Sequence, residues 1–217
     1  MPVLCPIILI RQRPNRLHIR CQTNLLGTGF VIGPQKHLVT CAHVASAGSG
    51  ACLYQWVNTN IFRQIHLVYV LPRYDLAVFE CDPPTPSGPF PFGDIHRVRP
   101  GDFIFYAGRG ENALIINRSS ISAIGTSLND GANVDFVEFI GEAVPGYSGG
   151  PVLNAKGEVI AIVREAWTKR GLKGGETVRV DRGFSTEILA ILHEQVYKEG
   201  AAIPHNDSST DLLNLVR

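Results

Sequence analysis

The sequence predicts an all-β fold with one helix near the C-terminal end. Short apolar runs separated by turn residues recur about a dozen times, as in a chain of many short strands. The 22 Gly and 14 Pro are spread throughout, and helical periodicity is absent until residue 185. At 217 residues and 45% hydrophobic, the chain is long enough to bury a substantial core.

The expected strands fall into two nearly equal sets. One conspicuously Pro-rich and Gly-rich segment, CDPPTPSGPFPFGD at residues 81–94, lies between them and is typical of a linker. We therefore expect an N-terminal set within residues 1–85 and a C-terminal set within residues 86–184. The expected strands are residues 6–10, 16–21, 27–33, 37–42, 66–71 and 75–81, followed by 102–108, 113–119, 134–140, 151–154, 158–163 and 176–184.

A helix is predicted over residues 185–200. Apolar residues recur there at steps of three and four, Ser185 or Thr186 can cap the first turn, and Gly200 can end the helix. Residues 201–217 form a polar tail with a small apolar tip.

The net charge of +1 conceals an uneven distribution. Residues 1–74 hold seven Lys or Arg and no Asp or Glu, so the remainder of the chain is acidic. Only Arg11, Arg13, Arg16 and Arg20 lie close together, and no basic helix or interleaved aromatic residues accompany them. We therefore expect no nucleic-acid partner.

Cysteine spacing and the first residues bear on metal binding and location. The five cysteines form no C-x-x-C pair, so we expect no metal, and no cofactor is indicated. The start of the chain lacks a basic segment before its apolar run, and no apolar span of 18 residues exists. These features predict a cytoplasmic protein without a membrane partner, although the Arg-rich, acid-free beginning leaves an organelle transit peptide open.

Ser148 lies among glycines in the segment PGYSGGPV, where it is either a nucleophile or a turn residue. Gly146-x-Ser148-x-Gly150 also fits the nucleophile elbow of α/β-hydrolases. That elbow leads from a strand directly into a helix, whereas here residues 151–154 and 158–163 indicate strand, turn and strand. The pattern that follows Ser148 disfavours the hydrolase elbow.

Two upstream segments supply the partners that a nucleophilic serine needs. A serine hydroxyl requires a base, and imidazole suits that role near neutral pH. TCAHV places His43 at the end of an expected strand, and YDLAV places Asp75 at the head of another. Asp75 is the first acidic residue of the chain, and it and Glu80 are the local carboxylates that could orient His43. Each residue alone has a structural explanation, but the three in this order favour a catalytic triad.

These segments resemble the trypsin-like (chymotrypsin-fold) serine peptidases, and they are most similar to the high-temperature-requirement branch. The motifs of that branch likewise read G-x-G-F, T-x-x-H-V, D-L-A-V and G-x-S-G-G-P. The resemblance covers roughly residues 25–185. It implies a single peptidase domain over residues 1–217, built from two six-stranded antiparallel Greek-key β-barrels with the active site between them. It also implies an oxyanion hole made by the backbone N–H groups of Gly146 and Ser148. In contrast to that branch, we expect no PDZ module after the peptidase domain.

The resemblance gives weaker guidance on the substrate. Glu142 lies where some relatives place the specificity residue, and the strand around Arg164 would pair with the backbone of a polypeptide substrate. Tyr147 occupies the place where digestive relatives have an Asp that pairs with a newly cut N-terminus, so zymogen cleavage is not indicated.

The predicted function is therefore a serine endopeptidase that acts through an acyl-enzyme, with Ser148 as nucleophile, His43 as acid and base, and Asp75 as the orienting carboxylate. The alternative is a catalytically silent interaction module that kept the same fold. The sequence determines neither the substrate nor the oligomeric state.

Overall fold

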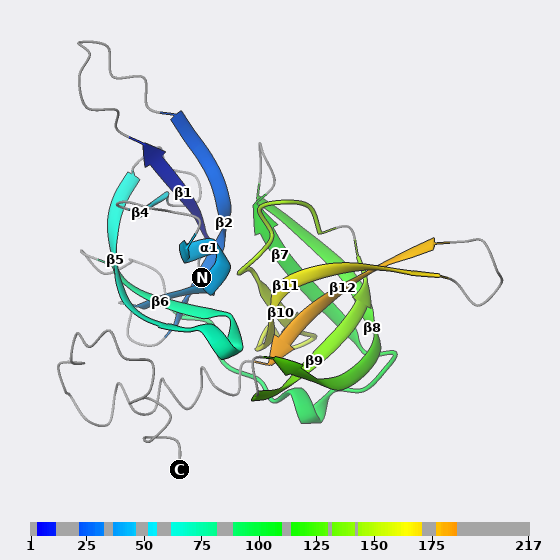
Figure 1. Ribbon diagram of the computed structural model, residues 1–217. Coiled ribbons are helices and arrows are strands. Elements are labelled where there is room, and N and C mark those ends of the chain that lie inside the picture. Colours follow the sequence, from blue (N-terminus) through cyan, green and yellow to red (C-terminus); the bar gives the residue numbers. More distant parts are fainter. Residues whose placement is uncertain are drawn as a thin grey trace, which may run out of the picture.

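The computed structural model contains strands arranged in two sheets that lie side by side (Figure 1). The structure describes part of the chain, in segments that are separated by gaps. The described residues are 4–11, 22–32, 37–46, 52–55, 62–81, 89–109, 114–129, 132–141, 143–170 and 177–185.

Within the described residues, the first sheet holds six antiparallel strands in the closed order β1-β2-β3-β6-β5-β4. Helix α1 (Ala42–Ser46) follows β3 directly, and the 3₁₀ turn η1 (Pro72–Tyr74) precedes β6. Both therefore lie at the same end of paired strands, where Cys41 is opposite Leu76. The strands are β1 (Leu4–Arg11), β2 (Gln22–Ile32), β3 (His37–Cys41), β4 (Cys52–Gln55), β5 (Phe62–Leu71) and β6 (Leu76–Cys81).

The second sheet, as far as the structure describes the chain, also holds six antiparallel strands, in the closed order β10-β11-β12-β9-β8-β7. A short 3₁₀ turn, η2 (Ile95–Arg97), lies between the two sheets in the sequence. The loop that contains Ser148 connects β9 to β10. The strands are β7 (Phe103–Arg109), β8 (Leu114–Asn129), β9 (Ala132–Ile140), β10 (Pro151–Asn154), β11 (Val159–Arg170) and β12 (Thr177–Ser185).

The predicted mostly-β fold is confirmed, with differences in individual elements. Strand β4 was not expected. Strand β8 runs to Asn129, well past the expected end at residue 119. The expected strand over residues 16–21 and residues 186–200 of the expected helix lie outside the described residues, while Ser185 ends β12. The Greek-key description and the domain boundaries stay predictions.

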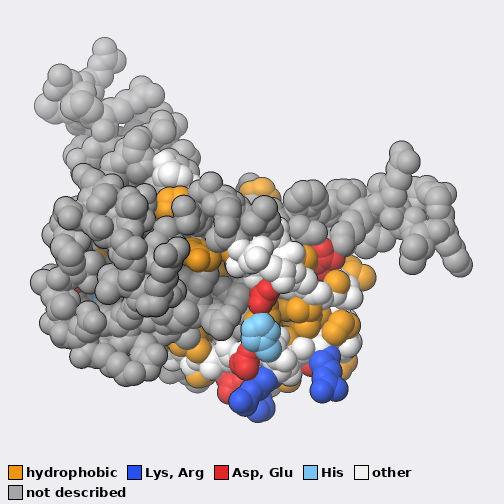
Figure 2. Space-filling view, turned by 60° about the horizontal axis from the view of Figure 1, so that its bottom comes forward, with side chains coloured by type: hydrophobic (Ala, Val, Ile, Leu, Met, Phe, Trp, Pro, Cys, Tyr) orange, Lys and Arg blue, Asp and Glu red, His pale blue; other side chains and the backbone are white. Residues whose placement is uncertain are grey.

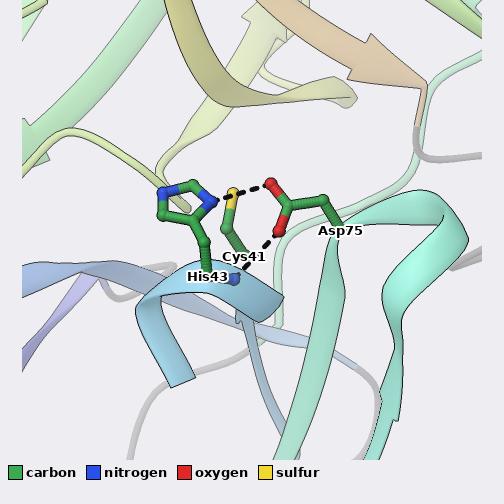
Figure 3. A group of neighbouring side chains, drawn as sticks. All are labelled: Cys41, His43 and Asp75. Carbon is green, nitrogen blue, oxygen red and sulfur yellow. Dashed lines mark hydrogen bonds and ion pairs between the residues drawn. The ribbon is translucent and has the colours of Figure 1, made fainter. Parts of the chain in front are cut away.

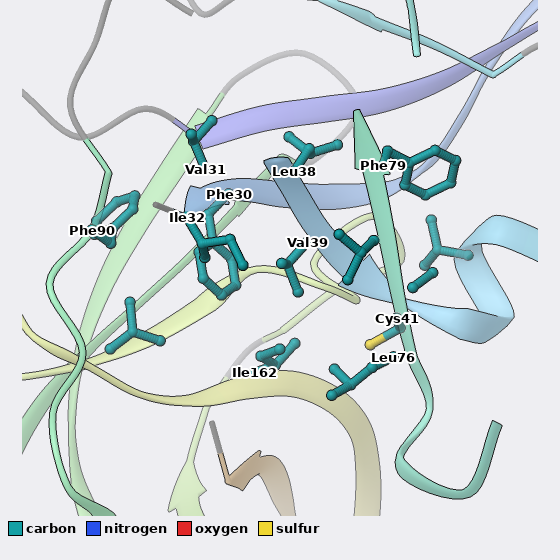
Figure 4. Packing of buried hydrophobic residues seen from close by; sticks show 14 of the residues in the cluster. Phe30, Val31, Ile32, Leu38, Val39, Cys41, Leu76, Phe79, Phe90 and Ile162 are labelled. Atoms are coloured by element: carbon teal, nitrogen blue, oxygen red, sulfur yellow. The ribbon is translucent and has the colours of Figure 1, made fainter. Parts of the chain in front are cut away.

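Buried apolar side chains connect the two sheets. One cluster, seen in Figure 4, contains Phe30, Leu38 and Phe79 of the first sheet and Ile162 of β11 in the second. The ring of Phe90 meets that of Phe30 edge-to-face with centroids 5.9 Å apart, so the connecting segment is anchored in this core. A second cluster of buried apolar side chains belongs to the second sheet. The shared cluster holds the facing ends of β3, β6 and β11 together.

Charged side chains of opposite sign lie next to one another on the face drawn in Figure 2. Arg97 pairs with Asp94 at 3.3 Å, and His96 lies 3.6 Å from Asp135. Among the described residues, no helix is long and apolar enough to cross a membrane.

Candidate active site

His43 and Asp75 face each other at the end of the first sheet (Figure 3). His43 Nδ1 lies 2.8 Å from Asp75 Oδ2, and the backbone N–H of His43 donates to Asp75 Oδ1 at 2.9 Å. The Asp75 carbonyl accepts a third hydrogen bond from the N–H of Ala42 at 2.9 Å. Asp75 therefore satisfies two of the N–H groups that open helix α1 and also fixes the imidazole of His43.

The local backbone explains how Asp75 reaches His43. Asp75 is the one non-glycine residue of the described part with positive φ, at φ 52° and ψ 43°. This left-handed conformation costs energy for most residues, but Asp tolerates it better than most. It ends the turn η1, where the N–H of Asp75 donates to the carbonyl of Pro72. The strained position therefore coincides with the carboxylate that contacts the imidazole.

Two successive hydrogen-bonded turns shape the Ser148 loop, and the second contains Ser148 itself. In the first turn, the Tyr147 N–H donates to the Val144 carbonyl at 3.0 Å, with Pro145 second and Gly146 third at φ 102°. Proline followed by a residue of positive φ is the pattern of a type II turn. In the second turn, the Gly150 N–H donates to the Tyr147 carbonyl at 2.9 Å.

The second turn also has the positive φ that a type II turn requires at its third residue, which is Gly149 at φ 87°. Ser148 is the second residue of this turn. Among the described residues, no hydrogen bond is donated by the N–H of Gly146 or by that of Ser148. With respect to the part of the chain that the structure describes, the loop thus leaves two backbone donors available, one on either side of Tyr147.

Thr28 of β2 connects the Ser148 loop to the first sheet. Its hydroxyl donates to the Gly146 carbonyl at 2.6 Å and accepts from the Arg109 N–H at 2.9 Å. Its own N–H donates to the Ser148 carbonyl at 2.8 Å. Thr28 is fully buried, so these hydrogen bonds are shielded from water. Sequence reasoning did not assign Thr28 a role, and its one signal was a hydroxyl inside the GTGF motif.

Gly149 brings the loop against the strand that leads to His43. A Cβ at Gly149 would overlap Thr40 Oγ1 and the Thr28 carbonyl, and it would lie 3.1 Å from the Cys41 backbone nitrogen. Ser148 therefore lies close to the β3–α1 junction, but within the described residues no hydrogen bond joins its hydroxyl to His43. Such hydrogen bonds are often long or misaligned when no substrate is bound.

The electrostatics of the site centre on Asp75, which is nearly buried. Burial raises the pKa of this carboxyl, but the hydrogen bonds from His43 and the nearby positive charge of Arg164 outweigh burial, so the pKa is lowered. Arg164 Nε lies 3.1 Å from Asp75 Oδ2. Asp75 is therefore an ionised acceptor, as a carboxylate that orients an imidazole must be.

Cys41 lies behind the imidazole and the carboxylate in Figure 3. It is buried and free, and its thiol donates to the Val163 carbonyl at 3.4 Å. Burial and the Asp75 charge raise the pKa of this thiol well above its usual value, so Cys41 stays protonated and weakly reactive.

Cys41, His43 and Asp75 could each offer one ligand atom within 4.8 Å of the others. Both oxygens of Asp75 already accept N–H donors, and Arg164 places a positive charge beside them. A protonated thiol and this cation make the cluster unfavourable for a metal ion.

The two residues expected to bind substrate have different outcomes. Glu142 lies outside the described residues, so its role as a specificity residue stays a prediction. Arg164 is on β11 as expected, but its side chain pairs with Asp75. Sequence reasoning did not foresee this contact, because residues 75 and 164 come from different sheets.

Comparison with known proteins places these motifs in context. A sequence model of the family described as trypsin-like peptidase domain matches residues 27–162. A probable periplasmic serine endoprotease, DegP-like, from Brucella suis biovar 1 (strain 1330) is 28% identical over 178 residues, covering 81% of this chain. A protein with the same description from Rhizobium meliloti (strain 1021) is 32% identical over 175 residues, covering 80% of this chain. The chain spans 33% and 34% of these two relatives' lengths.

Solved structures share the fold at lower sequence identity. The HtrA-type protease AlgW with decapeptide has a TM-score of 0.70 at 20% identity and covers 92% of this chain and 64% of its own. The same protease with tripeptide has a TM-score of 0.69 at 22% identity, with coverage of 93% and 62%.

The expected cytoplasmic location is wrong, because these curated relatives are named periplasmic. The expectation depended on the first residues of the sequence. A chain that spans about a third of its relatives does not report its compartment through those residues.

Proposed function

Because the chain belongs to the trypsin-like peptidase domain family, as its motifs predicted, we propose that it is a serine endopeptidase with Ser148, His43 and Asp75 as its triad. The observation that carries the proposal is the pair of hydrogen bonds from His43 to the Asp75 carboxylate, at 2.8 and 2.9 Å. The Ser148 loop, bound to the same end of the first sheet through Thr28, supports it.

The chemical role of each residue follows from its contacts. Ser148 attacks the peptide carbonyl while His43 accepts its proton, and Asp75 holds the imidazole in the tautomer whose Nδ1 is protonated. His43 then donates that proton to the leaving amine, which leaves an acyl ester on Ser148. Water attacks this ester by the same route and regenerates the free hydroxyl.

The two available backbone donors support an oxyanion hole. The N–H groups of Gly146 and Ser148 are the ones that the resemblance assigns to the developing negative charge. In a type I turn the Pro145–Gly146 peptide would be reversed, and the Gly146 N–H would point the other way. The positive φ of Gly146 therefore favours a preformed hole, and each such donor contributes about 3 kcal/mol to transition-state stabilisation.

The proposed substrate is a polypeptide. The similar HtrA-type proteases were solved with a tripeptide and with a decapeptide, and the curated relatives are named endoproteases. The location carried over from those relatives is the periplasm.

Covalent labelling by a fluorophosphonate probe tests the proposal. We expect wild-type protein to be labelled and Ser148→Ala to remain unlabelled, because the probe forms its bond to the activated hydroxyl. A matched control, Ser119→Ala, removes an exposed hydroxyl whose partner is the Ile140 carbonyl and should label like wild type. Absence of wild-type labelling, under conditions that label a known serine peptidase, would favour the silent interaction module instead.

A further inference from the structure

Arg164 brings a positive charge from the second sheet to a carboxylate of the first. It belongs to β11, whereas Asp75 lies between η1 and β6. Its Nε is 3.1 Å from Asp75 Oδ2, and the two side chains are 19% and 11% exposed. A pair this shielded from solvent is held more firmly and screened less by salt than a surface ion pair.

Both carboxylate oxygens of Asp75 have partners in this arrangement. Oδ1 accepts from the backbone N–H of His43, and Oδ2 is shared by His43 Nδ1 and Arg164 Nε. A buried carboxylate needs such partners, because an unpaired buried charge is strongly destabilising. Since both nitrogens contact one oxygen, the imidazole and the guanidinium lie within about 6 Å of each other, the range in which neighbouring charges affect titration.

Resting on the proposed peptidase site, we propose that Arg164 is a positioning residue that anchors Asp75, and that its positive charge opposes protonation of His43, the base of the proposed triad.

The direction of this effect follows from the charges. A protonated His43 and Arg164 are both cations, and they compete for the same carboxylate oxygen. Protonation of His43 is therefore less favourable with Arg164 present than with a neutral residue in its place. The described groups that face Asp75 are His43 on α1, Cys41 on β3 and Arg164 on β11. Cys41 stays neutral and Asp75 stays ionised, so Arg164 is the charge that a substitution can change.

Two variants separate charge from hydrogen bonding. Arg164→Gln retains an N–H donor for Asp75 but removes the charge, and Arg164→Lys retains the charge but loses the planar donor. We would measure kcat/KM on a peptide substrate from about pH 5 to pH 8, each variant relative to its own plateau. For Arg164→Gln, we expect the acid limb to move to higher pH, with a loss of about threefold on that limb. Arg164→Lys should retain the wild-type limb.

A surface arginine provides the matched control. Arg97 is 86% exposed and pairs with Asp94, so Arg97→Gln removes the same charge without touching Asp75. Its acid limb should coincide with that of wild type. Circular dichroism verifies that each variant is folded, and Arg164→Met replaces the Gln variant if the latter does not fold.

A second measurement does not require activity. In a Ser148→Ala background, NMR titration of the His43 ring should show its midpoint at higher pH after Arg164→Gln than before. An unchanged titration and an unchanged acid limb would overturn the role of Arg164. If the NMR midpoint moves but wild-type protein resists the fluorophosphonate probe, the coupling stands and the proposed peptidase activity fails.

Discussion

The two halves of the candidate site are held in place by different means. His43 and Asp75 are fixed by side-chain hydrogen bonds at the end of the first sheet, with Arg164 added from the second. The Ser148 loop is fixed by backbone hydrogen bonds and by glycines with positive φ. Loss of a functional group should therefore damage the first half, whereas a backbone restriction should damage the second.

The largest effect should come from Asp75→Asn, which tests the half of the site that side-chain hydrogen bonds hold in place. The new amide can still accept from the His43 backbone, but its NH₂ group would face Nδ1 and favour the wrong tautomer. We expect kcat to fall about 10⁴-fold while the fold is retained. Steady-state kinetics on a peptide substrate measures this. Asp94→Asn, at an exposed turn, is the control, and a loss of similar size in that variant would contradict the assignment.

Gly146→Ala tests the other half, the Ser148 loop, which backbone conformation holds in place. A Cβ disfavours φ 102° and would reverse the peptide that carries one oxyanion donor. We expect kcat to fall about 100-fold to 1,000-fold with little change in KM. Gly157→Ala is a matched control, because Gly157 also has positive φ (79°) and a Cβ there would meet nothing within 4 Å. Equal losses in both variants would mean that strain alone, and not the lost donor, explains the effect.

Thr28→Val tests the connection between the halves. The substitution preserves volume but leaves the Gly146 carbonyl and the Arg109 N–H without their hydroxyl partner. We expect the free energy of unfolding to decrease by about 1–3 kcal/mol and kcat/KM to fall about tenfold. Urea denaturation and kinetics measure the two effects. Thr28→Ser keeps a hydroxyl and should retain most of the wild-type stability and activity. Thr126→Val, at an exposed position, should change the free energy of unfolding by less than about 0.5 kcal/mol.

The smallest effect concerns acid stability. Because the pKa of Asp75 is lowered in the folded protein, its contribution to the free energy of unfolding is present above the unfolded value, near pH 4. That contribution is lost as pH falls through the lower folded value. Urea titrations at neutral and acidic pH should show a larger loss for wild type than for Asp75→Asn. Equal losses would mean that the carboxylate is not stabilised by its partners.

Local signals carried the predictions made from the sequence. Three contiguous motifs predicted the candidate site: the glycines around Ser148, the TCAHV segment and the YDLAV segment. In the first two motifs, the backbone conformation depends on residues that are near in the sequence. The strand pattern gave the mostly-β fold for the same reason, since alternation and turn residues act over a few positions. Strand β4 was not predicted, and the ends of β8 and β11 were misjudged because cross-strand pairing extends them.

The sequence by itself determined the residue types for the proposed chemistry and the glycines that permit the Ser148 turns. Only the tertiary structure decided that Arg164 pairs with Asp75 and that Thr28 binds the Gly146 carbonyl. Arg164 and Asp75 are separated by 89 positions in the sequence, and Thr28 and Gly146 by 118 positions. No local spacing therefore encodes these two contacts. They arise because closing each sheet and packing both against a shared core fixes which strand ends meet.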